Sequence, residues 1–343
     1  MKIIVDGMGG DNAPECVVEG ACLAAEEMPD GTGIILVGKE ALLKAELRKL
    51  HYKGDRIEVV NADDVITNEE SPVRAIRRKK ESSIVKGIEM LRDGKGDAFV
   101  SAGSTGALLA GGLLILGRIS GVDRPSLATI YPVIGSEPSL ILDAGANAEC
   151  RANNLREFGV MGSIYMEKVM GRANPTVGLV NIGTEEGKGT ALTKEAFKLL
   201  KESDLNFVGN IESRELQNGA ADVIVTDGFT GNALIKLTEG IGAMVLREMK
   251  KRFTSSAMAK MGALLLKEQL LGIKKEFDYS EYGGAPILGV KGVVLKSHGS
   301  SDATAIKQTI LKAIPFVENR VVDTIASAIS ELAAADTANA ADI

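Results

Sequence analysis

The sequence predicts an α/β fold built on a doubly wound, mostly parallel sheet. From Met1 to about Val225, short apolar runs rich in Val and Ile alternate with helical patterns, which is typical of β-α-β units. Five of these runs lead into turns of Gly, Asp, Asn, Ser and Thr that open a helix. No Pro- or Ser-rich linker divides the chain, so we expect residues 1–334 to form a single α/β domain of two interlocked lobes.

The expected strands are short and alternate with helices along the chain. The first begins at Lys2, and the others cover residues 34–37, 57–60, 98–100, 139–142, 177–180, 206–208, 223–225 and 293–295. The apolar segment from Gly106 to Gly117 is far shorter than the roughly 20 residues of a membrane-spanning helix. We therefore expect it to be a buried core helix.

Near Lys236 the pattern changes to a basic amphipathic helical arm, residues 236–275, within the same domain. Its basic residues include Lys250, Lys251, Arg252, Lys260, Lys267, Lys274 and Lys275. Such an arm can dock a carrier protein, contact a membrane or join two subunits, or it can simply pack between helices. A final amphipathic helix precedes an Ala-rich tail, residues 335–343, which we expect to be disordered.

The composition limits the possible functions. A formal net charge of -6 and a pI near 5.3 disfavour a general nucleic-acid-binding protein. The three cysteines, Cys16, Cys22 and Cys150, show neither Cys-x-x-Cys spacing nor a nearby histidine, so we expect no disulfide and no metal site. A strand that begins at Lys2 leaves no room for a secretory leader, and we expect a cytoplasmic protein.

The five polar turns are predicted to bind an anion. Each would present N–H groups and the positive end of a helix, and parallel strands would bring all of them to one sheet edge. Taken singly, such turns also occur as ordinary strand-to-helix connections, and their aspartates occur as helix caps. The candidate residues for phosphate or oxyanion binding are Asp6, Gly9, Gly10, Asp11, Ser104, Thr105, Gly106, Asn147, Asn181, Thr184, Asp227, Gly228, Gly231, Asn232 and Lys236.

The sequence does not match three familiar motifs: the dinucleotide fingerprint, the P-loop and the nucleophile elbow. Gly7-x-Gly9 follows a strand, but Asn12 occupies the third glycine position of a dinucleotide fingerprint, so no nicotinamide cofactor is expected. The segment 183–190 has the wrong glycine spacing for a phosphate-binding P-loop. Gly-Ser-Thr-Gly at 103–106 is not a nucleophile elbow. The predicted site therefore lacks a side-chain nucleophile.

Further residues are expected at the edge of the site. Ser71 and Pro72 predict a helix start, after which Arg74, Arg77 and Arg78 share one face. Guanidinium groups suit phosphate or an acidic protein, although such a run is more often a solvated face. The other edge candidates are Tyr282, Gly283, Gly284 and His298.

The opening Val5-Asp-Gly-Met-Gly-Gly-Asp-Asn-Ala-Pro14 closely resembles the signature of the phosphate acyltransferases of bacterial phospholipid synthesis, the PlsX type. The likeness continues over nearly the whole chain, at residues 72–83, 101–107, 121–125, 142–147, 181–185, 225–232, 282–284 and 298–301.

The resemblance implies an isocitrate/isopropylmalate-dehydrogenase-like fold and transfer of a fatty acyl group from acyl carrier protein to inorganic phosphate. It also implies a homodimer that associates peripherally with the membrane and hands acyl phosphate to the glycerol-phosphate acyltransferase. Phosphate is then the nucleophile, which agrees with a site poor in nucleophilic side chains. The alternatives are a phosphotransacylase acting on short-chain acyl-CoA, a non-catalytic membrane scaffold and a nicotinamide-dependent dehydrogenase.

Overall fold

The computed structural model describes residues 1–276 and 283–341, whose strands form two sheets. The larger sheet has the order β3-β2-β1-β4-β12-β11-β5, in which β1, β2, β3, β4 and β12 are parallel. Its strands are β1 (Lys2–Asp6), β2 (Gly33–Gly38), β3 (Ile57–Asn61), β4 (Ala98–Ser101), β5 (Ser126–Leu127), β11 (Ala285–Leu288) and β12 (Val293–Lys296).

The smaller sheet has the order β6-β7-β10-β8-β9, and only β6 is antiparallel to its neighbour. Its strands are β6 (Thr129–Tyr131), β7 (Ser139–Leu142), β8 (Thr176–Asn181), β9 (Asn206–Glu212) and β10 (Val223–Val225). Two sheets replace the single sheet edge expected from the sequence. The polar turns after β1 and β4 belong to one sheet, and those after β7, β8 and β10 belong to the other.

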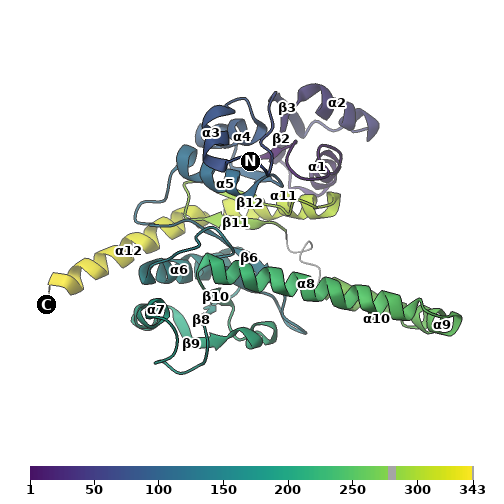
Figure 1. The fold of residues 1–343 in the computed structure, drawn as a ribbon. Helices are drawn as coiled ribbons and strands as arrows, with labels where there is room; N and C mark the ends of the chain where they lie inside the picture. The colour runs from purple at the N-terminus through teal and green to yellow at the C-terminus, as the bar shows by residue number, and fades with distance from the viewer. Residues whose placement is uncertain (277–282, 342–343) are drawn as a thin grey trace.

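Helices cover the sheets on both faces, as the prediction of a doubly wound fold required (Figure 1). In the described ranges the α-helices are α1 (Glu15–Glu27), α2 (Glu40–Lys49), α3 (Pro72–Arg78), α4 (Ser83–Arg92), α5 (Thr105–Gly111), α6 (Ala152–Lys168), α7 (Ala191–Lys201), α8 (Gly228–Phe253), α9 (Ala257–Leu265), α10 (Lys267–Glu276), α11 (Ala303–Glu318) and α12 (Val321–Ala341). A π-helix, η1 (Gly112–Leu116), continues α5, and a 3-10 helix, η2 (Ser213–Asn218), follows β9.

The first strand shows that the larger sheet is buried on both faces. Ile3 and Val5 belong to one hydrophobic cluster, which also contains Val18 of α1 and Ile310 of α11. The intervening Ile4 belongs to the other cluster. Alternate side chains of a strand point to opposite faces, so a continuous apolar run is the pattern of a parallel sheet covered on both sides.

The two sheets meet where the chain passes directly from β5 to β6. Leu127 of β5 accepts a hydrogen bond from Ala144 N at 2.8 Å, and the backbone N–H of Leu127 donates to Asp143 Oδ1 at 3.2 Å. Ala144 follows β7 of the smaller sheet. The chain returns to the larger sheet through β11 and β12, so the lobe built on the larger sheet contains segments from before and after the smaller sheet.

The predicted arm is divided into α8, α9 and α10. It begins at Gly228 because Asp227 caps α8 by accepting from Thr230 N at 2.9 Å. Thr254 Oγ1 donates to Lys250 O at 2.8 Å and ends α8, and Ser256 caps α9. The distal part of the arm projects beyond the rest of the chain, to the right in Figure 1.

Two other expectations differ from the structure. The segment 106–117 is only partly buried, because Leu113 and Leu114 lie 43% and 49% exposed on the outer side of η1. The Ala-rich tail is helical through Ala341 as part of α12, and residues 342–343 lie outside the described residues. Alanine has the highest helix propensity, and the tail residue Asp336 is held by two hydrogen bonds from Arg156 of α6.

Candidate functional site

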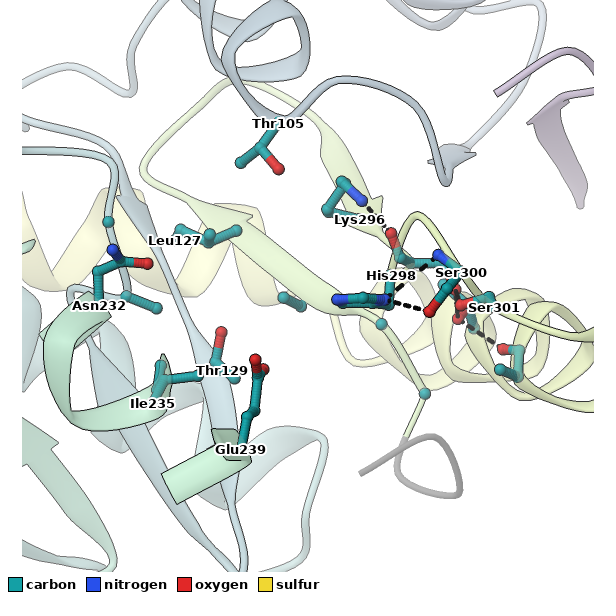
Figure 2. A pocket seen from close by; sticks show the side chains of 18 of the residues that line it. Thr105, Leu127, Thr129, Asn232, Ile235, Glu239, Lys296, His298, Ser300 and Ser301 are labelled. Carbon is teal, nitrogen blue, oxygen red and sulfur yellow. Dashed lines mark hydrogen bonds between the residues drawn. The ribbon is translucent and has the colours of Figure 1, made fainter. Parts of the chain in front are cut away.

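A cavity of about 670 Å³ lies between the two lobes and is the candidate site. Side chains from both sheets and from α5, α8 and α11 converge on it (Figure 2). Its polar and charged lining residues are Thr105, Thr129, Asn232, Lys236, Glu239, Lys296, Ser297, His298, Ser300, Ser301, Asp302 and Thr309. Leu127, Ala144, Ile235, Ala285 and Ala305 form an apolar part of the wall.

Lys296 is the last residue of β12, and its half-buried side chain lines the cavity. Its Nζ atom donates to Ala102 O at 3.4 Å and to Ser297 O. Burial lowers the pKa of Lys296 to about 8, with Asp11 and Asp6 acting in the opposite direction. Lys296 was not among the residues proposed from sequence. The available signal was a lysine that directly follows the predicted strand 293–295.

His298 lies in the turn between β12 and α11, and its ring points into the cavity (Figure 2). Ser300 N donates to His298 Nδ1 at 3.3 Å, and Ser300 Oγ lies 2.8 Å from the same nitrogen. Because Nδ1 accepts the backbone hydrogen bond, the neutral ring carries its proton on Nε2. His298 can therefore present an N–H donor to an oxyanion in the cavity.

The loop after β1 supports this turn from outside the cavity. Asp11 N donates to Gly299 O at 2.8 Å, and Asn12 Nδ2 donates to Ser301 O at 3.4 Å. Asp6, at the end of β1, is buried and accepts from Met8 N at 3.1 Å and from Ser101 Oγ at 2.7 Å. Burial raises the pKa of Asp6, and these hydrogen bonds oppose the rise. The first polar turn therefore uses its aspartate to hold itself and β4 together.

The start of α8 brings Asn232, Lys236 and Glu239 to the opposite wall of the cavity. Lys236 Nζ forms an ion pair with Glu239 Oε2 at 2.8 Å, one turn along the same helix. Gly231 allows this approach, because a Cβ atom at that position would lie 1.9 Å from Asp143 O. The helix thus packs directly on the backbone of the loop after β7.

The turn after β7 is organised around the carboxylate of Asp143. The carboxylate accepts from Gly145 N at 3.1 Å, Ala146 N at 2.9 Å and Asn147 N at 2.6 Å. Burial raises the pKa of Asp143, and these hydrogen bonds oppose the rise. The Asn147 side chain donates to Pro125 O and to Asp143, so Asn147 does not line the cavity.

The structure divides the residues proposed from sequence into three groups. Those that line the cavity are Thr105, Asn232, Lys236, Gly283, Gly284 and His298. Those that belong to strand ends, loops or helix starts leading to the cavity without lining it are Asp6, Gly9, Gly10, Asp11, Ser104, Gly106, Asn147, Asp227, Gly228 and Gly231.

The third group has no part in the cavity wall. The Asn181 side chain donates from Nδ2 to Lys188 O at 3.2 Å and accepts at Oδ1 from Ile182 N. Thr184 is exposed. Arg74 and Arg78 lie exposed on α3. Tyr282 lies outside the described residues. The arm residues Lys250, Lys251, Arg252, Lys260 and Lys267 are exposed on α8, α9 and α10.

Sequence comparisons identify the family. A family model described as "Fatty acid synthesis protein" matches residues 1–324. The phosphate acyltransferase of Alkaliphilus oremlandii is 54% identical over 332 residues, which cover 97% of this chain and 98% of that protein. The chain belongs to this fatty acid synthesis protein family. The phosphate acyltransferase of Clostridium acetobutylicum is 51% identical over 332 residues, 97% of this chain and 100% of that protein.

The family confirms the resemblance found in the sequence, and the chain is an acyltransferase of lipid and fatty acid synthesis. Solved structures of the same fold include EutD phosphotransacetylase from Staphylococcus aureus, with a TM-score of 0.60 and 18% identity over 93% of this chain and 94% of that one. A phosphotransacetylase from Streptococcus pyogenes has a TM-score of 0.61 and 18% identity over 92% of this chain and 94% of that one. At this identity the likeness shows a shared α/β fold.

The described residues contain neither a candidate metal site nor a candidate membrane-spanning helix. Among the residues that the structure describes, no group of three or more His, Cys, Asp or Glu side chains is arranged to hold a metal ion. Within the same residues, no helix has both the length and the apolar character that crossing a membrane requires.

Proposed function

We propose that this acyltransferase transfers a fatty acyl group from acyl carrier protein to inorganic phosphate and releases acyl phosphate for phospholipid synthesis. The observation that carries the proposal is the convergence of Lys296, Lys236 and His298 on one cavity between the lobes. An ammonium group and an imidazole N–H are suited to a phosphate anion and to the oxyanion of a thioester under attack. The names of the relatives support phosphate as the acceptor.

In this proposal phosphate attacks the thioester carbonyl carbon directly. Holding phosphate next to the carbonyl can supply about 7–11 kcal/mol of the barrier. One donor aimed at the oxyanion, such as His298 Nε2–H, can supply about 3–4 kcal/mol more. Positioning is therefore the larger contribution, and the cavity does not need a nucleophilic side chain.

Ser300 is the rival nucleophile, because its Oγ lies 2.8 Å from His298 Nδ1. The same nitrogen already accepts the backbone N–H of Ser300. In the described part of the chain no carboxylate hydrogen-bonds to the His298 ring, so the third member of a catalytic triad is missing. This arrangement favours direct attack over an acyl-enzyme.

The apolar wall and the exposed cations support the choice of acyl donor. Leu127 and Ile235 line the same cavity as Lys296 and can contact an acyl chain next to the reacting carbonyl. A carrier protein with an acidic surface would be attracted to exposed cations such as Lys250 and Lys251 of α8. A donor of this kind distinguishes the proposal from a phosphotransacylase that acts on short-chain acyl-CoA.

The arm supports two further contacts, with a second subunit and with a membrane surface. Leu237, Ile241 and Met244 of α8 are 62%, 49% and 52% exposed, which a homodimer interface would cover. At the tip, Met258 and Leu265 of α9 are 82% and 80% exposed beside basic residues, as in segments that lie on lipid headgroups. Peripheral contact would let acyl phosphate pass to the glycerol-phosphate acyltransferase.

The function is tested by incubating the pure protein with palmitoyl acyl carrier protein and phosphate, and trapping acyl phosphate with hydroxylamine. Palmitoyl hydroxamate that requires phosphate is the expected product. Turnover restricted to acetyl-CoA would favour the short-chain phosphotransacylase. Background turnover with every donor would favour the non-catalytic scaffold.

A further inference from the structure

We propose that the Lys296 ammonium group is the acid that protonates the departing thiol of the acyl donor, and that it regains its proton from the newly acylated phosphate. The inference rests on the proposed function and adds to it a catalytic residue with one defined task. Two observations carry it: the way in which two carbonyl groups hold the ammonium group, and the contrast with Lys236 across the cavity.

The backbone fixes Lys296 without neutralising it. Its Nζ atom donates to the carbonyl oxygens of Ala102, the residue after β4, and of Ser297. An ammonium group has three N–H donors, so these two bonds leave one for the cavity that the side chain lines. Within the described residues, no carboxylate forms an ion pair with Lys296.

Lys236 differs from Lys296 in this respect. Its Nζ atom is paired with Glu239 Oε2 at 2.8 Å, and it lies on α8 rather than at a strand end. An ammonium group has three N–H donors, so the pair with Glu239 leaves Lys236 further donors that suit binding a phosphate anion. A lysine held by neutral carbonyl groups in a partly buried site can release its proton. The cavity thus contains one cation for binding and one for proton transfer.

The charges around Lys296 agree with this assignment. Burial lowers its pKa to about 8, Asp11 and Asp6 oppose the fall, and Lys236 contributes to it. The carboxylates of Glu239 and Asp302 also line the cavity, but Lys236 and the N–H of Ala305 already engage them. An alkyl thiol has a pKa of about 8.5, and proton transfer is most effective between groups of similar pKa.

The proposed step balances atoms, protons and charge. An oxygen of the hydrogen phosphate dianion forms a bond to the carbonyl carbon, and the C–S bond breaks with its electron pair on sulfur. Lys296 Nζ gives a proton to that sulfur and becomes a neutral amine. The amine then takes the remaining P–OH proton of the acyl phosphate, so acyl phosphate dianion and free thiol leave and the ammonium group is restored.

The test varies the leaving group. Palmitoyl thioesters of alkyl thiols and of nitrothiophenols are compared with inorganic phosphate as acceptor, because a nitrothiophenolate departs without being protonated. Lys296→Arg keeps the positive charge but cannot release a proton near neutral pH. We expect it to lower kcat/KM about 10²–10⁴-fold for alkyl thioesters and less than about 10-fold for nitrothiophenyl esters.

Lys236→Met is the matched control on the opposite wall. It removes a cation assigned to binding, so it should raise KM for phosphate by a similar factor with both classes of thioester. His298→Gln tests the other candidate acid in the cavity. If the leaving-group dependence appears in His298→Gln and not in Lys296→Arg, the proton comes from His298 and the proposal is overturned.

The unmodified enzyme gives an independent measurement in case Lys296→Arg does not fold. With alkyl thioesters, kcat/KM should fall as the pH rises through about 8, where Lys296 loses its proton. With nitrothiophenyl esters this fall should be absent, although phosphate ionises identically in both assays. The same profile for both esters rejects the role of Lys296 and leaves the proposed function intact, whereas absence of any phosphate-dependent turnover rejects the proposed function itself.

Discussion

Replacing Gly231 with alanine tests whether the contact between α8 and the loop after β7 positions the site. The added Cβ atom would lie 1.9 Å from Asp143 O, where contacts below 3.0 Å are essentially never observed. Helix and loop must therefore separate by about 1.1 Å, the difference between these distances. Gly231 directly precedes Asn232 and lies five residues before Lys236, so both cavity residues move with the helix.

Gly231→Ala should lower both the stability and the activity of the protein. Overpacking of this kind costs about 1–3 kcal/mol, which outweighs the roughly 0.5–1 kcal/mol that alanine contributes over glycine in a helix. A displacement of about 1 Å of groups that position a substrate lowers the rate roughly 10²-fold. We expect Gly231→Ala to reduce both the urea midpoint and the phosphate-dependent kcat/KM.

Gly240→Ala is the matched control in the same helix, because a Cβ atom added there would meet no atom from outside the helix within 4 Å. It should stabilise the protein by up to about 1 kcal/mol and leave turnover unchanged. Urea denaturation followed by circular dichroism and the hydroxamate assay measure the two effects. A Gly231→Ala protein with the midpoint and turnover of the unmodified enzyme would refute the reasoning.

Three further substitutions test separate parts of the structure. Ser300→Ala should keep kcat within about 10-fold, because phosphate attacks directly; an acyl-serine trapped by rapid quench and mass spectrometry would contradict this. His298→Ala should lower kcat about 10²–10³-fold with little change in KM for phosphate, and steady-state kinetics showing only a KM effect would reassign it to binding. Arg156→Met should lower the free energy of unfolding by about 1 kcal/mol at neutral pH, since Asp336 is half exposed. Arg156 hydrogen bonds hold the pKa of Asp336 below its usual range, so this stabilisation exists above the usual Asp pKa and is lost as the pH falls through the lowered one. Urea titrations should converge in strong acid, and equal stability at neutral pH would count against the bridge.

The sequence predicted the strands that form the parallel parts of the two sheets. Residues 98–100 and 293–295 became β4 and β12 with one residue added at the end of each, because apolar runs of this length occur mainly in sheets covered on both faces. The short strands β5, β6 and β11 were missed. They have two, three and four residues, too few for a periodic pattern, and β5 pairs with β11, which is distant in sequence.

The division into two sheets also could not be read from the sequence. Buried parallel strands have the same composition in either sheet, so the pattern at 139–142 says nothing about which neighbours it pairs with. The sheets separate at Ala128, between β5 and β6, where no linker composition marks the change. Lys296 was missed for a related reason, because its importance arises from the carbonyl groups that long-range folding brings to it.

We therefore expect side-chain donors, rather than the main-chain amides of the turns, to bind the anion. Main-chain amides in the turns looked available, but Asp6 accepts from Met8 N, Asp143 accepts from three successive amides of its own turn, and Asp227 accepts from Thr230 N. An amide already bonded to a carboxylate would have to give up that charge-assisted bond to bind phosphate. The aspartates thus stabilise the turns, and the turns place side-chain donors such as Lys296 and His298 at the cavity, which makes single side-chain substitutions informative.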